Sequence, residues 1–207
     1  ENNNNDNTDL IELYEMANKI SNIDNITTHP NPETGPVSAF YIIMALGAIK
    51  QLPPSKIIDI LINLCNDKYF KEKKNKDLKL ANNIIFYINE FKRKDFDFWD
   101  YFGDMDSYNS IYKNMGWYEH AFKLTLYYLV NFDQIEKKNL FSKILQDICN
   151  LGGDSDTNAC IVGGVIGPLI GYKNFGDYFK KVLDVIPRDR YMFSICLMVE
   201  YVLYLNK

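Results

Sequence analysis

Apolar side chains recur every three or four residues along nearly the whole chain, which is the spacing of one face of an α-helix. The first stripe consists of Leu10, Leu13, Tyr14, Ala17 and Ile20. No stretch alternates apolar and polar residues for long enough to predict a β-strand. The pattern therefore predicts an all-α protein.

Proline, glycine and polar residues divide this pattern into separate helices. Pro36 suits the first turn of a helix that ends near Leu52, and Pro54 starts the next one. Residues 95–115, which are rich in aromatic and turn-forming side chains, are predicted to form a long loop with short helical turns. The predicted helices begin near residue 10 and then cover 36–52, 54–65, 77–91, 118–132, 134–150, 155–171, 175–185 and 188–206.

The segment from residue 151 to 159, which reads LGGDSDTNA, has the clearest chemical pattern. Its two glycines allow a sharp turn, and the polar residues after them open the next predicted helix. Because hard cations prefer oxygen ligands, Asp154, Asp156 and Thr157 are candidate ligands for Mg²⁺, Mn²⁺ or Ca²⁺. The alternative is a capped helix start without a metal.

Small residues follow these candidate ligands at intervals of four along the predicted helix. Ala159, Gly163, Gly167 and Gly171 share one face. Because glycine destabilises a helix by about 1 kcal/mol relative to alanine, this face indicates close packing against another helix or a ligand. The uncharged stretch 157–172 is too short to span a membrane, which takes about 20 residues.

Three motifs resemble those of the ADP-ribosylglycohydrolase family, and they occur in the family's order. The first is THPNPE at residues 28–33, followed by an apolar helix. The second is Gly116-Trp117-Tyr118 with Ala121 after it, and the third is the Gly-Gly-Asp-x-Asp-Thr segment with its small-residue helix. The resemblance extends over nearly the whole chain.

The resemblance implies a compact, orthogonal multi-helix bundle that carries two Mg²⁺ ions in a cleft, with Mn²⁺ as the other candidate metal. It places Asp154, Asp156 and Thr157 on metal ligands. His29 falls on a residue of the ADP-ribose pocket, and Gly116, Trp117 and Tyr118 fall near residues that contact ADP-ribose. The structural alternatives are a loop histidine that only bonds locally, and aromatic residues that anchor a helix start. His120 is interpreted as a surface or cap-region residue.

Other family elements are absent from the sequence. The family also takes metal ligands from an N-terminal Thr-Asp-Asp motif and carries an early acidic residue and a glycine-rich phosphate loop. Thr8-Asp9-Leu10 lacks the second Asp. We therefore expect the chain to carry about half of the site. It is expected to be the C-terminal portion of a larger hydrolase and to lack the N-terminal helices of the family fold. A missing N-terminal segment or a second chain is the expected partner.

Composition narrows the remaining classes of function. The 207 residues, 47% apolar and 24% charged, can bury a large core, and a net charge of −4 gives no basis for nucleic-acid binding. Four widely spaced cysteines without a Cys-x-x-Cys pair argue against zinc and fit a reducing, intracellular location, expected to be cytoplasmic. Residues 1–9 are predicted to be disordered, before a single all-helical domain over residues 10–207.

The predicted function is Mg²⁺-dependent hydrolysis of an ADP-ribosyl glycosidic bond, with ADP-ribose or an ADP-ribosylated protein as the ligand. No general base is evident, so no catalytic residue is assigned. One alternative is a non-catalytic relative that binds metal or ADP-ribose. The other is a structural or interaction protein that keeps only the helical scaffold.

Overall fold

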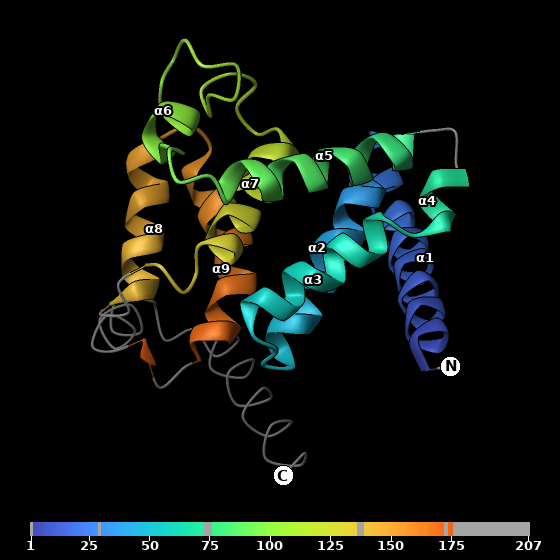
Figure 1. Cartoon of the computed structure of the whole chain (residues 1–207). Helices are drawn as coiled ribbons and strands as arrows, with labels where there is room; N and C mark the ends of the chain where they lie inside the picture. The colour runs from blue at the N-terminus through green and yellow to red at the C-terminus, as the bar shows by residue number, and fades with distance from the viewer. Residues whose placement is uncertain (1, 29, 73–75, 136–138, 172–173, 176–207) are drawn as a thin grey trace, which may run out of the picture.

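The computed structural model describes residues 2–28, 30–72, 76–135, 139–171 and 174–175. Every regular element in these ranges is a helix, which confirms the all-α prediction. In chain order the helices are α1 (Asn2–Thr28), α2 (Thr34–Ile49), α3 (Pro54–Cys65), α4 (Lys68–Glu72), α5 (Lys76–Phe91), α6 (Phe98–Phe102), α7 (Tyr118–Val130), α8 (Leu140–Leu151) and α9 (Ser155–Ile170) (Figure 1).

The helix boundaries differ most from the predicted ones at the starts of α1 and α8, and α4 has no predicted counterpart. Helix α1 begins at Asn2, so it includes most of the polar stretch that was predicted to be disordered. Extending an existing helix adds one hydrogen bond per residue and needs no new nucleus. Helix α8 begins at Leu140, later than predicted, because Asn139 has a φ of 57° and a left-handed residue cannot belong to a right-handed helix. The predicted helices at 175–185 and 188–206 lie outside the described residues.

Helix α9 packs against α2, α7 and α8, and its small-residue face meets α2 and α8. The Tyr41 hydroxyl of α2 donates a hydrogen bond of 2.8 Å to the Ile161 carbonyl of α9. A Cβ on Gly164 would lie only 2.6 Å from that hydroxyl oxygen. Gly163 and Gly167 face the Phe141 ring of α8 at ordinary contact distance. The predicted close packing is therefore confirmed, and neighbouring helices supply it.

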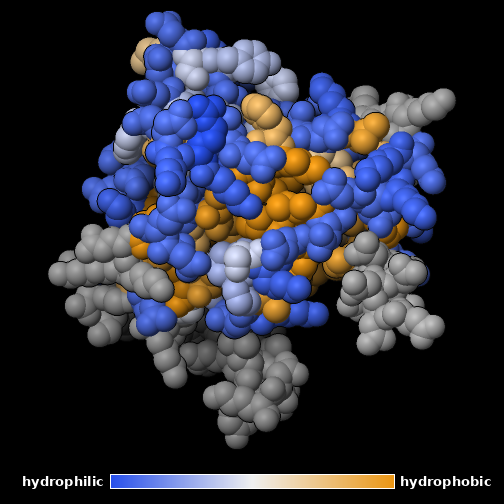
Figure 2. Space-filling view, viewed as in Figure 1, coloured by the Kyte–Doolittle hydropathy of each residue, from blue (hydrophilic) through white to orange (hydrophobic). Residues whose placement is uncertain are grey.

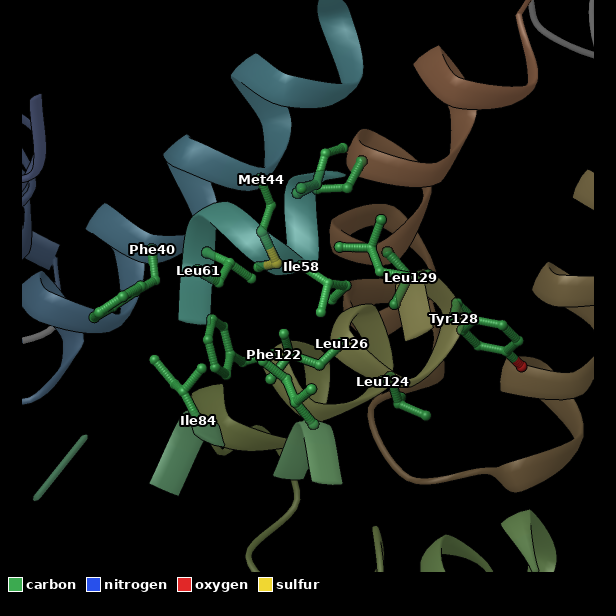
Figure 3. Close-up of a cluster of buried hydrophobic side chains, with 14 of the residues drawn as sticks. Phe40, Met44, Ile58, Leu61, Ile84, Phe122, Leu124, Leu126, Tyr128 and Leu129 are labelled. Carbon is green, nitrogen blue, oxygen red and sulfur yellow. The ribbon is translucent and has the colours of Figure 1, made fainter. Parts of the chain in front are cut away.

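Helix α7 lies in the middle of the core (Figure 3). Buried side chains of α2, α3 and α5 converge on it, including Met44, Ile58 and Ile84. Phe122 and Leu126 of α7 meet them from the other side. Full burial of one such side chain contributes about 1.5–3 kcal/mol to the stability of the fold. Several of them hold α7 in place, so the helix gives firm support to the residues at its start.

The aromatic segment before α7, residues 95–117, is fixed to the core at its base, and its tip is exposed. Phe96 and Tyr101 contact the buried Phe91 ring, with centroid distances of 5.1 and 5.6 Å. The Ile111 amide then donates to the Phe102 carbonyl at 2.9 Å, and both of these residues are fully buried. The segment between them projects beyond α6 at one end of the molecule, which confirms the predicted loop (Figure 1).

On the face seen in Figure 2, apolar residues reach the surface in the middle, and polar residues surround them. None of the helices in the described ranges is both long enough and apolar enough to cross a membrane.

Candidate functional site

The two glycines after α8 make the sharp turn that the sequence predicts. Gly152 has a φ of 78° and Gly153 a φ of 65°, both in the left-handed region that favours glycine. A Cβ on Gly152 would lie 2.8 Å from the Tyr112 hydroxyl oxygen, and one on Gly153 would lie 3.0 Å from the Ile111 carbonyl oxygen. The turn therefore needs glycine for its backbone angles and for its close contact with residues 111–112.

Asp154 follows this turn at the N-cap position of α9, but its carboxylate does not cap the helix. Only its carbonyl oxygen takes part, accepting a 3.0 Å hydrogen bond from the Asn158 amide. The side chain is half-buried, whereas Asp156 and Thr157 are exposed. The capping alternative considered from the sequence thus does not account for Asp154.

The carboxyl groups of Asp154 and Asp156 lie next to each other. The pKa of Asp156 is lowered, first by a hydrogen bond from the Thr157 amide and then by one with the Asp154 side chain. Neighbouring carboxyl groups favour a divalent cation that can neutralise both. In the part of the chain that the structure describes, however, no group of three or more His, Cys, Asp or Glu side chains is placed to hold a metal.

The loop before α7 brings a predicted ligand-binding residue to this carboxylate pair. Gly116 has a φ of 81°, and a Cβ on it would lie 3.6 Å from the Asp154 Oδ2 atom. The Trp117 amide donates to the Asn114 carbonyl at 2.9 Å, which closes the turn that contains Gly116. Trp117 itself is 41% exposed. The second and third motifs of the sequence therefore meet at Gly116 and Asp154.

His120 holds this loop from inside. It lies in the first turn of α7, in the cap region that the sequence indicated, but it is buried and not at the surface. Its side chain is only 7% exposed, and its Nε2 atom lies 2.8 Å from the Lys113 carbonyl oxygen. Desolvation lowers the pKa of the ring, which favours the neutral form that donates through Nε2. The fold buries His120 because α7 is surrounded by other elements from its first turn onward.

Tyr118 links the start of α7 to the first motif. Its hydroxyl donates a 2.8 Å hydrogen bond to the Glu33 Oε2 atom, and burial raises the pKa of this hydroxyl. The two side chains border a small cavity of about 30 Å³ between α2, α5 and α7. Glu33 was not predicted as a site residue, although it stands in the motif at residues 28–33. His29 of that motif lies outside the described residues.

Comparison with known proteins agrees with the motifs. The family model described as ADP-ribosylglycohydrolase matches residues 9–194. A protein of Acanthamoeba polyphaga mimivirus, provisionally named an ADP-ribosyl glycohydrolase, is 30% identical over 169 residues. The match covers 81% of this chain and 46% of the viral protein, so the chain spans about half the length of this relative. No solved structure matches the chain.

Proposed function

This chain belongs to the ADP-ribosylglycohydrolase family, and from that premise we propose that it forms part of a hydrolase of ADP-ribosyl glycosidic bonds. The proposed ligand is ADP-ribose or an ADP-ribosylated protein. The proposed cofactor is Mg²⁺, with Mn²⁺ as the other candidate. Because the chain spans about half of its viral relative, we assign the remaining ligands to a further segment or a second chain.

The proximity of Gly116 to the Asp154 carboxylate is the observation that carries this proposal. The loop that we propose to bind the ligand and the carboxylates are far apart in the sequence, yet Gly116 and Asp154 lie close together in the structure. The absence of a Cβ at Gly116 lets a ligand approach the backbone next to the carboxylates. A site that joins a polar organic ligand to a metal needs such an arrangement.

The oxygen-bearing side chains at the turn are of the type that a hard divalent cation prefers. Asp154 and Asp156 supply two carboxylates, and Thr157 offers a neutral hydroxyl beside them. Mg²⁺ takes six oxygen ligands and retains several waters, so the other positions belong to water, substrate and ligands from elsewhere. Bound there, the metal would fix the ribose hydroxyls and polarise the bond to be cleaved.

The neighbouring side chains would bind and orient the ligand. The exposed ring of Trp117 offers a face on which adenine can stack. Tyr118 and Glu33 hold each other in place and keep the start of α7 fixed to the first motif. We also propose that His29 donates a hydrogen bond to a ribose hydroxyl or a phosphate oxygen. No general base is assigned.

A second candidate function is binding of metal or ADP-ribose without turnover. The small number of candidate metal ligands favours this function. Among the described residues, Asp154 and Asp156 are not joined by a third Asp, Glu, His or Cys side chain that could hold a metal with them. The two functions differ in whether ADP-ribose is released from a modified protein. They share the same metal and ligand contacts.

Thermal unfolding with and without Mg²⁺ tests the metal site. Saturating Mg²⁺ should raise the melting temperature, since a ligand at 100 times its Kd stabilises a protein by about 2.7 kcal/mol. Asp154→Asn should abolish the shift, whereas the control Asp59→Asn, an exposed residue of α3, should retain it. No shift in the unaltered chain, or an equal shift in Asp154→Asn, would contradict the proposal.

Calorimetric titration with ADP-ribose then tests the organic ligand, with the chain alone and with the rest of the protein present. Heat with both parts together, and none with this chain alone, would establish a site shared between them. Release of ADP-ribose from a modified protein would separate the hydrolase from the binding protein.

A further inference from the structure

A second cavity adjoins the Gly152-Gly153 turn on the side of α6. It has a volume of about 310 Å³. Its walls are formed by Trp99, Asp100, Asp104, Tyr112, Asn150 and Leu151. The last two residues end α8 directly before the turn, and the Tyr112 hydroxyl touches the turn at Gly152. The cavity therefore lies beside the end of α8, directly before the turn that leads to Asp154.

The segment beside the cavity exposes large apolar side chains to an unusual degree. Six of the twelve exposed large hydrophobic residues in the described ranges come from residues 99–117. They are Trp99, Met105, Tyr108, Tyr112, Met115 and Trp117. Clustered exposed aromatic and methionine side chains are typical of surfaces that bind another molecule. Figure 2 shows this end of the molecule as pale side chains among polar ones.

Acidic side chains also occur in this part of the chain. Residues 95–112 contain five Asp and no Lys or Arg, between the basic residues Lys92, Arg93 and Lys94 on one side and Lys113 on the other. Three of the five are used locally, because Asp95 pairs with Arg93, Asp97 caps α6 and the Asp104 Oδ1 atom accepts a 2.9 Å hydrogen bond from the Asp106 amide. Asp100 and Asp104, which line the cavity, are exposed and form no ion pair within the described part of the chain. Lys113 directs its ammonium group to the Asp106 carbonyl, 3.0 Å away.

We propose that this cavity binds an arginine side chain of a basic peptide segment in the protein substrate, next to the modified residue rather than the modified residue itself. A guanidinium group is planar, so it can stack on the Trp99 ring while it donates hydrogen bonds to a carboxylate. The compact ammonium of lysine cannot make both contacts equally well. The acidic and aromatic walls thus select for Arg over Lys, and for either over a neutral side chain.

This inference rests on the proposed function for the identity of the partner, because it makes that partner an ADP-ribosylated basic protein. A substrate whose ADP-ribosyl group lies at Gly116 and Asp154 would extend its peptide along the turn toward the cavity. The cavity would then contribute to the choice among modified proteins. It would have no part in bond cleavage.

Tryptophan fluorescence tests the proposal. The chain has two tryptophans, so Trp117→Phe leaves Trp99 as the only one. This variant is titrated with a blocked peptide of Arg and Gly, and with matched peptides in which Lys or Gln replaces Arg. The Arg peptide should change the Trp99 emission to saturation, with weaker binding for Lys and none for Gln. Added salt should weaken the binding, because the charges are exposed.

The double variant Asp100→Asn/Asp104→Asn, in the Trp117→Phe background, should bind the Arg peptide about tenfold more weakly. The matched control Asp24→Asn/Asp59→Asn removes the same charge from α1 and α3 and should bind normally. Circular dichroism checks that both double variants keep their helices. Equal binding of the Gln peptide, or an equal loss in both double variants, would overturn the proposal. The assay contains neither Mg²⁺ nor ADP-ribose, so its outcome is independent of the Asp154 test.

Discussion

Helix α7 and residues 99–117 before it both contain many large apolar side chains, but α7 buries them and residues 99–117 expose them. Nine of the thirteen residues of α7 are buried, among them Phe122 and Tyr128. Residues 99–117 also carry aromatic and methionine side chains, yet they hold half of the large hydrophobic residues that the described ranges expose. The two regions join at Gly116 and Trp117, where the candidate site lies.

This difference shows how a rigid element can position an exposed one. Residues 102 and 111 are fully buried and fix the base of the loop, and His120 fixes its end from the first turn of α7. The side chains between these anchors need not pack into the core, so they remain available to a ligand. The comparison predicts large effects on stability in α7 and small ones at the loop surface.

The largest effect is expected for Leu126→Ala, because Leu126 is fully buried where α7 meets the core. The lost apolar contacts and the cavity left behind should lower the free energy of unfolding by about 2–5 kcal/mol. Urea unfolding followed by circular dichroism measures this change. The control is Tyr108→Ser, whose side chain is 90% exposed and which should change stability by less than about 0.5 kcal/mol. Similar losses for both variants would remove the distinction between the regions.

Gly152→Ala should follow, with a loss of about 1–3 kcal/mol, because alanine would be strained at a φ of 78° and would collide with the Tyr112 hydroxyl. Gly163→Ala is the matched control within α9. Its new methyl group would make ordinary contact with Phe141, and it should be neutral or stabilise the helix by up to about 1 kcal/mol. Thermal unfolding compares the two, and a stabilised Gly152→Ala would show that the turn does not require glycine.

Tyr118→Phe should lower the free energy of unfolding by about 1 kcal/mol, since it removes the hydrogen bond to Glu33 and leaves that carboxylate without this donor. Tyr108→Phe, which loses only an exposed hydroxyl, is the control. Urea unfolding of both variants gives the difference. An unchanged Tyr118→Phe would mean that this bond does not secure the start of α7.

The smallest effect concerns the pH dependence that His120 gives to stability. Burial lowers the pKa of its ring in the folded chain, so protons bind the unfolded chain more readily. The stabilisation is therefore complete above the ordinary histidine pKa of about 6.5 and is lost as pH falls through the lower folded value. His120→Gln should flatten the decline in unfolding free energy between pH 7.5 and 5.5. The control variant His29→Gln should keep the part of this decline in unfolding free energy that is due to His120. Parallel curves for the unaltered chain and His120→Gln would contradict this role.

The local features of the fold could be predicted from the sequence. The periodicity and the proline positions placed α3, α5, α7 and α9 within a few residues of their observed bounds, because helix formation depends on neighbours along the chain. The Gly-Gly turn and the small-residue face of α9 were predicted for the same reason. The motifs also identified the family, since they are contiguous in sequence.

Only the tertiary structure decided which of these local features meet. The proximity of Gly116 to Asp154, the hydrogen bond from Tyr118 to Glu33 and the burial of His120 all depend on how separate elements pack. The cavity beside Trp99 likewise arises where α6, the loop and the end of α8 come together. The hydrophobic effect favours burial of an apolar side chain but does not select its neighbour. The sequence pattern therefore shows that a residue will be buried, and not which element will cover it. That choice is made by packing the helices around α7, and it converts three separate motifs into one candidate site.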